Sequence, residues 1–234
     1  DSSSSRGLGD VYKRQAGDSE KAENQLDGLF GNQNLFLVHS ALSDLESGEY
    51  LHQERVYREG WQARASSQTL DLRAGGIEAR LLSEGDGQRV VARYKNEDRL
   101  ELNFRPGKPL VVFGDRGLSR KGANPAAVSW YWSYTRLRAE GILIQDGIKI
   151  PVEGIAWMDH EISSSQLGDG LEGWDWTCMQ LDDGTEIKAY RLRTKEGGSD
   201  PWSAVYWIDS EGKIESVYAD RFSWETEDSW TSPN

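Results

Sequence analysis

The stretch LELNFR, residues 100–105, alternates apolar and polar side chains at every position. Successive side chains of an extended strand point to opposite faces, so Leu100, Leu102 and Phe104 would share one face. The same period of two recurs in TLDLR and IEARLL, which lie on either side of Gly75-Gly76. Because glycine pairs favour two-residue turns, this arrangement predicts a β-hairpin.

Further turn dipeptides separate the other apolar stretches, namely Asp146-Gly147, Asp183-Gly184 and Glu211-Gly212. Turn signals at intervals of about 8–12 residues are typical of antiparallel sandwiches and barrels. No segment of the sequence has a convincing amphipathic helix pattern. We therefore expect an all-β protein.

The composition restricts the function classes. The 234 residues, with 10 Trp and 9 Tyr, suffice for one large β domain or two small ones. A net charge of -12 disfavours nucleic-acid binding, and no apolar run is long enough for a transmembrane helix. The single cysteine, Cys178, excludes an intramolecular disulfide and a Cys-rich zinc site, and we interpret it as a packed residue.

Two segments suggest boundaries. DSSSSRGLGDVYKRQ, residues 1–15, has neither periodicity nor a signal-peptide pattern, and we interpret it as a non-native linker or adapter scar. A targeting signal would then be missing as well. SSSQLGDGLEG, residues 163–173, is small, polar and rich in glycine, and is typical of a connection between two domains.

The stretch WMDHE places Asp159, His160 and Glu161 side by side. On a strand, the two carboxylates would share one face and His160 would point away. Two neighbouring carboxylates can raise one another's pKa, which suits a general acid. Alternatively, they solvate a strand end or accept hydrogen bonds. A His-Glu metal motif needs two histidines one helical turn apart, and none of the three histidines has that partner, so we expect no metal.

Aromatic residues alternate in two other stretches. Trp130, Trp132 and Tyr134 would share one face of their strand, and so would Trp174 and Trp176. Such stripes favour a core position, and the alternative is the wall of a cavity for an apolar or sugar ligand.

Three cationic or titratable side chains have similarly open roles. His39 is interpreted as a hydrogen-bonded structural residue or a functional one. Arg191 and Arg193 would share one face, where they could pair with carboxylates or hold Asp159 or Glu161 ionised.

Several motifs occur in a familiar order: LFLVHSALSD, GDRGLSRKG, WYWSYTRLRAEGIL, VEGIAWMDHE, GWDWTCMQLDDGTEIKAYRLR and WTSP. Together they resemble the hydroxyneurosporene synthase family, also called CrtC-like or AttH-like, from about Leu35 to the end of the chain. The resemblance implies tandem lipocalin-like β-barrels. It implies a first barrel over residues 16–165, incomplete at its start, and the truncated beginning of a second over residues 166–234.

The best-known members of this family are carotenoid 1,2-hydratases, which add water to an isoprenoid double bond without a cofactor. The resemblance therefore implies an apolar or lipid ligand, with Asp159 as the acid and His160 tuning it or positioning water. Asp175 is a second candidate acid, inferred from the sequence alone. Aromatic faces could stabilise the cation formed on protonation. The candidate ligand-binding residues are Trp130, Trp132, Tyr134, Trp157, Trp174, Trp176 and His39.

Two alternatives to a hydratase remain open. One is a non-catalytic carrier of apolar ligands, periplasmic or exported, since many family members accompany ABC-transporter genes. The other is a carbohydrate-active β protein, because a carboxylate pair about 6–7 Å apart on one strand face could suit an inverting glycosidase. One departure from the family is local: Ile162 stands where a tryptophan is common, so no indole is available for stacking at that position.

Overall fold

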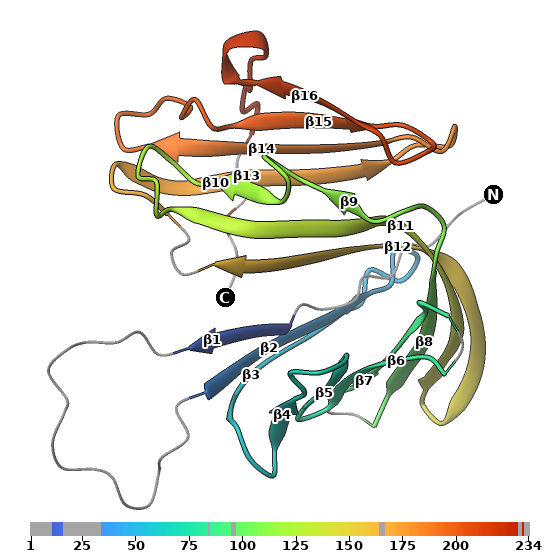
Figure 1. Ribbon diagram of the computed structural model, residues 1–234. Coiled ribbons are helices and arrows are strands. Elements are labelled where there is room, and N and C mark those ends of the chain that lie inside the picture. Colours follow the sequence, from blue (N-terminus) through green and yellow to red (C-terminus); the bar gives the residue numbers. More distant parts are fainter. Residues whose placement is uncertain are drawn as a thin grey trace, which may run out of the picture. The chain divides into compact units, whose positions relative to one another are not determined.

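The computed structural model of the chain describes residues 11–15, 34–83, 85–94, 97–163, 167–228 and 231, the first range for its backbone alone (Figure 1). Apart from one short 3-10 helix, η1 (Ala219–Arg221), every element in these ranges is a β-strand. The strand pairs whose register is defined are antiparallel. The expected all-β class is therefore confirmed. Within these ranges no helix has the length and apolar character needed to cross a membrane.

The chain forms two compact units, each built from two separate stretches of the sequence. Unit 1 comprises residues 1–105 and 138–154, and unit 2 comprises residues 106–137 and 155–234. The long strands β11 (Val128–Gln145) and β12 (Ile148–Ser163) run through both units. The predicted barrel boundary between residues 165 and 166 stays a prediction, since residues 164–166 lie outside the described ranges.

Unit 1 contains two sheets. One has the strand order β1-β2-β3, and the other runs from β4 through β8 to β11. Their strands are β1 (Val11–Gln15), β2 (Asn34–Ser43), β3 (Tyr50–Arg58), β4 (Ala63–Ala65), β5 (Asp71–Ala74), β6 (Ile77–Leu81), β7 (Gln88–Arg93) and β8 (Arg99–Pro106). Although residues 1–15 were interpreted as non-native, β1 pairs with β2, placing Gln15 opposite Asn34. The linker interpretation stays a prediction.

The sequence patterns of unit 1 form the strands expected of them. Leu100, Leu102 and Phe104 of β8 are all buried, as their alternation predicts. The hairpin between β5 and β6 turns at Gly75, whose φ is +57°. The positive φ favours glycine there, and a Cβ atom at Gly75, 2.0 Å from the Tyr57 hydroxyl oxygen, would also require the Tyr57 side chain to shift.

Unit 2 contains the first part of β11, up to residue 137, and the last part of β12, from residue 155. It also contains the short strands β9 and β10 and a four-stranded sheet of order β13-β14-β15-β16. The turns predicted at Asp183-Gly184 and Glu211-Gly212 connect β13 to β14 and β15 to β16. The strand bounds are β9 (Val111–Val112), β10 (Leu118–Arg120), β13 (Leu171–Gln180), β14 (Glu186–Thr194), β15 (Ala204–Ile208) and β16 (Ile214–Tyr218).

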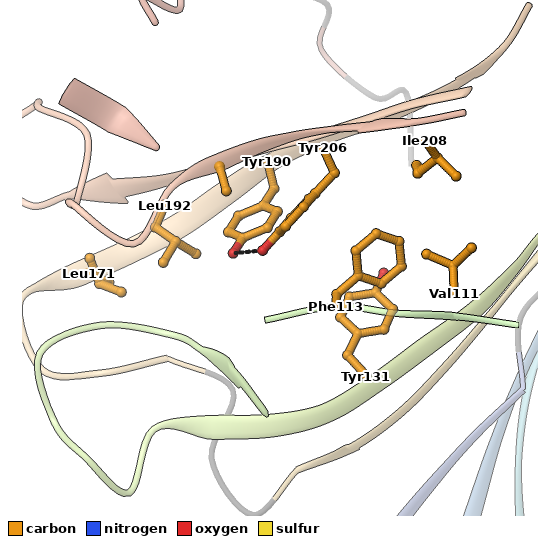
Figure 2. Close-up of a cluster of buried hydrophobic side chains, with 9 residues drawn as sticks. Val111, Phe113, Tyr131, Leu171, Tyr190, Leu192, Tyr206 and Ile208 are labelled. Carbon is orange, nitrogen blue, oxygen red and sulfur yellow. Dashed lines mark hydrogen bonds between the residues drawn. The ribbon is translucent and has the colours of Figure 1, made fainter. Parts of the chain in front are cut away.

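The core of unit 2 lies between these strands (Figure 2). Phe113 contacts both Tyr131 and Tyr206, with ring centroids 5.5 Å and 5.0 Å apart. The Tyr190 and Tyr206 hydroxyl oxygens lie 3.4 Å apart. The hydrophobic cluster consists of Val111, Phe113, Tyr131, Leu171, Tyr190, Leu192, Ala204, Tyr206 and Ile208.

A buried ion cluster fixes one end of this core. The Glu186 side chain is 0% exposed, and its carboxylate accepts hydrogen bonds from Lys108 Nζ and Arg136 Nε, each at 2.6 Å. The Thr135 hydroxyl donates a third, at 3.1 Å. Lys108 also donates to the carbonyl oxygen of Asp209 at 2.7 Å. These bonds join β11, β14 and the β15–β16 hairpin, and each partner of the buried charge is hydrogen-bonded.

Candidate functional site

Asp159 lies on β12, at the edge of its sheet, where the residue is exposed while its carboxylate contacts the buried Ser133 of β11. Its carboxylate oxygen Oδ1 accepts a hydrogen bond from the Trp157 indole nitrogen at 2.7 Å, and a second from the Ser133 hydroxyl. Trp157 is two residues away on the same strand face, whereas Ser133 comes from the neighbouring strand β11. The alternation predicted for WMDHE thus positions Asp159 among polar partners.

Tyr131 is the third side chain at this carboxylate. Burial raises the pKa of Tyr131 far above its usual range, and the charge of Asp159 together with hydrogen bonding to it raises this pKa further. Tyr131 is therefore a neutral hydroxyl donor over the whole physiological range. We call Asp159, Tyr131, Ser133 and Trp157 the Asp159 cluster.

Lys188 lies beside the Asp159 cluster, on β14, and its side chain is fully buried. Its Nζ atom is 3.2 Å from the ring centroid of Tyr131 and 3.8 Å from that of Phe113. Among the described residues it has no hydrogen-bond partner. Burial lowers the pKa of Lys188 to about 7, against the opposing charge of Asp159. A buried amine that titrates near neutrality is a feature of functional sites.

Glu161 shares the inward face with Asp159, but the two carboxylates do not form the predicted acid pair. Glu161 Oε1 lies 2.9 Å from Lys121 Nζ. Burial raises the pKa of Glu161, but the charge of Lys121, hydrogen bonds from Ser129 and Lys121 and the charge of Lys188 together outweigh burial, and the pKa lies below its usual value. Of the two interpretations of this pair, a raised pKa is therefore wrong for Glu161, because a lysine from the β10–β11 loop stabilises its ionised form.

Cys178 of β13 faces the same interior. It lies opposite Lys188 in the β13–β14 register. Burial, and secondly the charge of Asp159, raise the pKa of Cys178 to about 11. The thiol is thus protonated near neutrality, which agrees with the interpretation of Cys178 as a packed residue rather than a nucleophile.

His160 points to the opposite face of β12, as the strand alternation predicts. Its ring stacks on Trp132, with centroids 4.4 Å apart and planes at 13°. Burial lowers the pKa of His160, so the ring is neutral at physiological pH. Within the described ranges, His160 forms no hydrogen bond with a residue of the Asp159 cluster. The predicted catalytic role of His160 stays a prediction.

Asp175 lies on the outer face of β13, where it is paired with arginines. Arg193 Nη1 donates a hydrogen bond to Asp175 Oδ1, and Arg191 Nη1 lies 3.9 Å from Oδ2. The two arginines therefore pair with a carboxylate, as one of the two interpretations expected, and that carboxylate is Asp175. Cys178 and Trp176 lie on the other face of the strand, so Asp175 is turned away from the Asp159 cluster.

The aromatic stripe of β11, formed by Trp130, Trp132 and Tyr134, does not lie in the core. Trp130 is 51% exposed, and Trp132 and Tyr134 are half-buried, because the alternate residues Tyr131 and Ser133 face inward. The core interpretation of this stripe is therefore wrong for Trp130, and the inward face carries one aromatic ring and several hydroxyls.

The second stripe faces inward but at an edge. Trp174 and Trp176 share the face of Cys178, yet they are 48% and 43% exposed because β13 has a partner strand on one side alone within the described sheet. Trp176 lies close enough to form a hydrogen bond with the Tyr131 hydroxyl. His39 belongs to unit 1, where its Nδ1 lies 3.8 Å from Glu54 Oε2. The ligand-binding roles of all these residues stay predictions.

Lys188, Tyr131 and Glu186 were not singled out from the sequence. The signal that could have found two of them is the stretch EIKAYRL, in which Glu186 and Lys188 share a strand face with Tyr190 and Leu192. Charged residues on the apolar phase of a strand indicate a paired or functional interior group. In the described parts of the chain, no group of three or more acidic, histidine or cysteine side chains is placed to hold a metal ion.

Comparison with known proteins places this chain in a family. A family model described as AttH-like matches residues 10–234. The chain belongs to the AttH-like family. An AttH-type protein of Nitrosomonas europaea has a similar structure, with a TM-score of 0.78 and 29% identity over 88% of this chain and 64% of that one. Kievitone hydratase of Nectria haematococca is also similar, with a TM-score of 0.62 and 14% identity over 79% of this chain and 55% of that one.

The AttH-like chain spans less than two-thirds of the length of either structure. No curated protein matches its sequence. The resemblance is thus confirmed for the AttH-like family, while the narrower hydroxyneurosporene synthase assignment and the expected truncation at both ends stay predictions. At 14% identity, the similarity to kievitone hydratase supports the fold alone.

Proposed function

We propose that this AttH-like chain carries a cofactor-independent hydratase site that adds water to a double bond of an apolar, isoprenoid-like or lipid-like substrate. The observation that carries the proposal is the convergence of hydrogen-bond donors from Trp157, Ser133 and Tyr131 on the carboxyl group of Asp159. Such donors fix the orientation of a catalytic carboxyl group.

Hydration needs a proton at one carbon and a hydroxyl at the other. In the proposed reaction, the Asp159 carboxyl group gives its proton to the alkene, and the carbocation that forms is captured by water. The oxonium then returns one proton to Asp159, so that one water is added and no cofactor is consumed. In this proposal the indole rings of Trp157 and Trp176, which lie beside Asp159 and Tyr131, stabilise the cation, because aromatic rings attract positive charge.

The buried amine of Lys188 supports this proposal over a passive carrier. A carrier needs an apolar wall, and an unpartnered lysine among aromatic rings costs free energy without improving such a wall. Beside Asp159, the charge of Lys188 stabilises the carboxylate that remains after proton transfer. From the family resemblance, we also propose that the protein is exported and associates with an ABC-transporter system.

The test uses purified protein with acyclic carotenoids and shorter isoprenoids in ¹⁸O-labelled water. Mass spectrometry should detect products that have gained one labelled water. Asp159→Asn should abolish the product while circular dichroism stays unchanged, and Asp175→Asn should retain it. Loss of product in Asp175→Asn alone would assign the acid to the other carboxylate. Recovery of unchanged ligand bound to wild-type protein, with no product, would favour the carrier.

A further inference from the structure

A small cavity of about 220 Å³ lies in unit 1, between β3 and the strands β6 and β7. Its floor is apolar, because Val38 and Ile77 are almost completely buried. Tyr57 and Tyr94 contribute aromatic walls. Burial raises the pKa of Tyr94 to about 12, so this wall carries no negative charge near neutrality.

Two of the polar side chains at the cavity, Gln53 and Arg93, have defined partners. Gln53 Nε2 donates to the carbonyl oxygen of Arg93 at 2.6 Å, which ties β3 to β7. Arg93 Nη1 lies 2.8 Å from Glu78 Oε1, so its charge is neutralised. Arg55 lines the cavity, yet no carboxylate of the described residues lies within ion-pair distance of it. Its recorded hydrogen bond is to the backbone carbonyl of Glu54, at 3.3 Å.

Several described arginines have no carboxylate partner, and Arg55 is the one among them that lines this cavity. A guanidinium presents its N–H donors in a planar fork that matches a carboxylate. Beside an apolar floor, it would bind the charged end of an amphipathic anion. The cavity is smaller than the roughly 300–1,000 Å³ of common ligand pockets, which limits the ligand to a small molecule.

We propose that this cavity binds a small organic carboxylate, whose charged group pairs with Arg55 and whose apolar part packs on Val38 and Ile77. This binding site belongs to unit 1 and does not depend on the hydration proposed for unit 2. The hydroxyl groups of Tyr57 and Tyr94 and the amide of Gln53 supply further polar contacts for the ligand.

The probe is hexanoate, titrated into ¹⁵N-labelled chain and compared with hexanol and hexylamine. The amide signals of Gly76 and Ile77, which line the cavity, report on occupancy. Hexanoate should shift both signals in a saturable way, and raised salt should weaken the binding. Hexanol should bind more weakly than hexanoate, and hexylamine should not bind.

Arg55→Met should weaken hexanoate binding at least about tenfold, because it removes a charge-assisted hydrogen bond and keeps the aliphatic stem. Arg55→Lys should retain part of the affinity. Arg58→Met is the matched control, since Arg58 lies on the opposite face of the same strand, and it should bind as the wild type does. Equal affinity in Arg55→Met and wild type, or saturable shifts that avoid Gly76 and Ile77, or no shift at all, would overturn the proposal. If Arg55→Met fails to fold, the lysine variant and the comparison of the three probes decide it.

Discussion

Replacing Lys188 by methionine should stabilise the folded chain below neutral pH. The Lys188 side chain is fully buried, and burial lowers its pKa to about 7 from an ordinary 10.5. Below pH 7 the folded state therefore carries a buried ammonium at a cost of about 5 kcal/mol, at about 1.4 kcal/mol per pKa unit. The rings of Phe113 and Tyr131 stabilise the ammonium and offset part of this cost, so about 5 kcal/mol is an upper figure.

The sign of the pH dependence follows from the direction of this pKa shift. Between pH 7 and 10.5 the unfolded state binds the Lys188 proton more tightly than the folded state, so wild-type stability rises with pH. Above about pH 10.5 both states are neutral, and the penalty vanishes. Lys188→Met should therefore be more stable than wild type by about 2–5 kcal/mol at pH 6. This advantage should shrink by about 1.4 kcal/mol per pH unit above pH 7.

The assay is urea unfolding followed by tryptophan fluorescence at pH 6, 8 and 10. The exposed Lys195 lies on the loop after the same strand, and Lys195→Met is the matched control that removes an equal charge from the surface. Its stability difference from wild type should be small and nearly independent of pH. The reasoning is refuted if Lys188→Met is no more stable than Lys195→Met at pH 6, or if its advantage stays constant from pH 6 to 10.

Two further predictions concern buried polar groups of unit 2. Glu186→Gln leaves the charges of Lys108 and Arg136 without their carboxylate. It should lower the free energy of unfolding in urea by about 3–5 kcal/mol. A decrease of less than about 1 kcal/mol would contradict the role of the ion cluster. The Cys178 thiol, with its pKa raised to about 11, should react with iodoacetamide at pH 8 about a hundredfold more slowly than a cysteine peptide, and unfolding in urea should restore the ordinary rate. Rapid alkylation of the folded chain would place Cys178 in a more open environment.

Local patterns predicted much of the fold. The alternation in residues 100–105 and the glycine turn at Gly75 specify a strand and a hairpin, because both depend on neighbours in the sequence. The alternation around Asp159 likewise predicted that His160 points away. These features need no knowledge of distant strands.

The face of β11 and the partners of Asp159 could not be predicted in the same way. Both phases of VSWYWSY contain aromatic rings, so hydrophobicity alone could not decide that Tyr131 and Ser133 face inward and Trp130 outward. The choice depends on what the opposite sheet presents, and there the Lys188 ammonium lies over the Tyr131 ring. Pairings between strands 30 or more residues apart are invisible to a period count, as the hydrogen bonds of Glu186 to β11 also illustrate.

The most direct test of the central claim is the turnover of Asp159→Asn in ¹⁸O-labelled water. Wild-type protein and the exposed control Asp182→Asn should both give the hydrated product, with one ¹⁸O atom per molecule. Asp159→Asn should give none while retaining the wild-type unfolding midpoint, because the amide keeps the hydrogen-bonded position but supplies no acidic proton. Equal product from Asp159→Asn and Asp182→Asn would contradict the assignment of Asp159 as the proton donor.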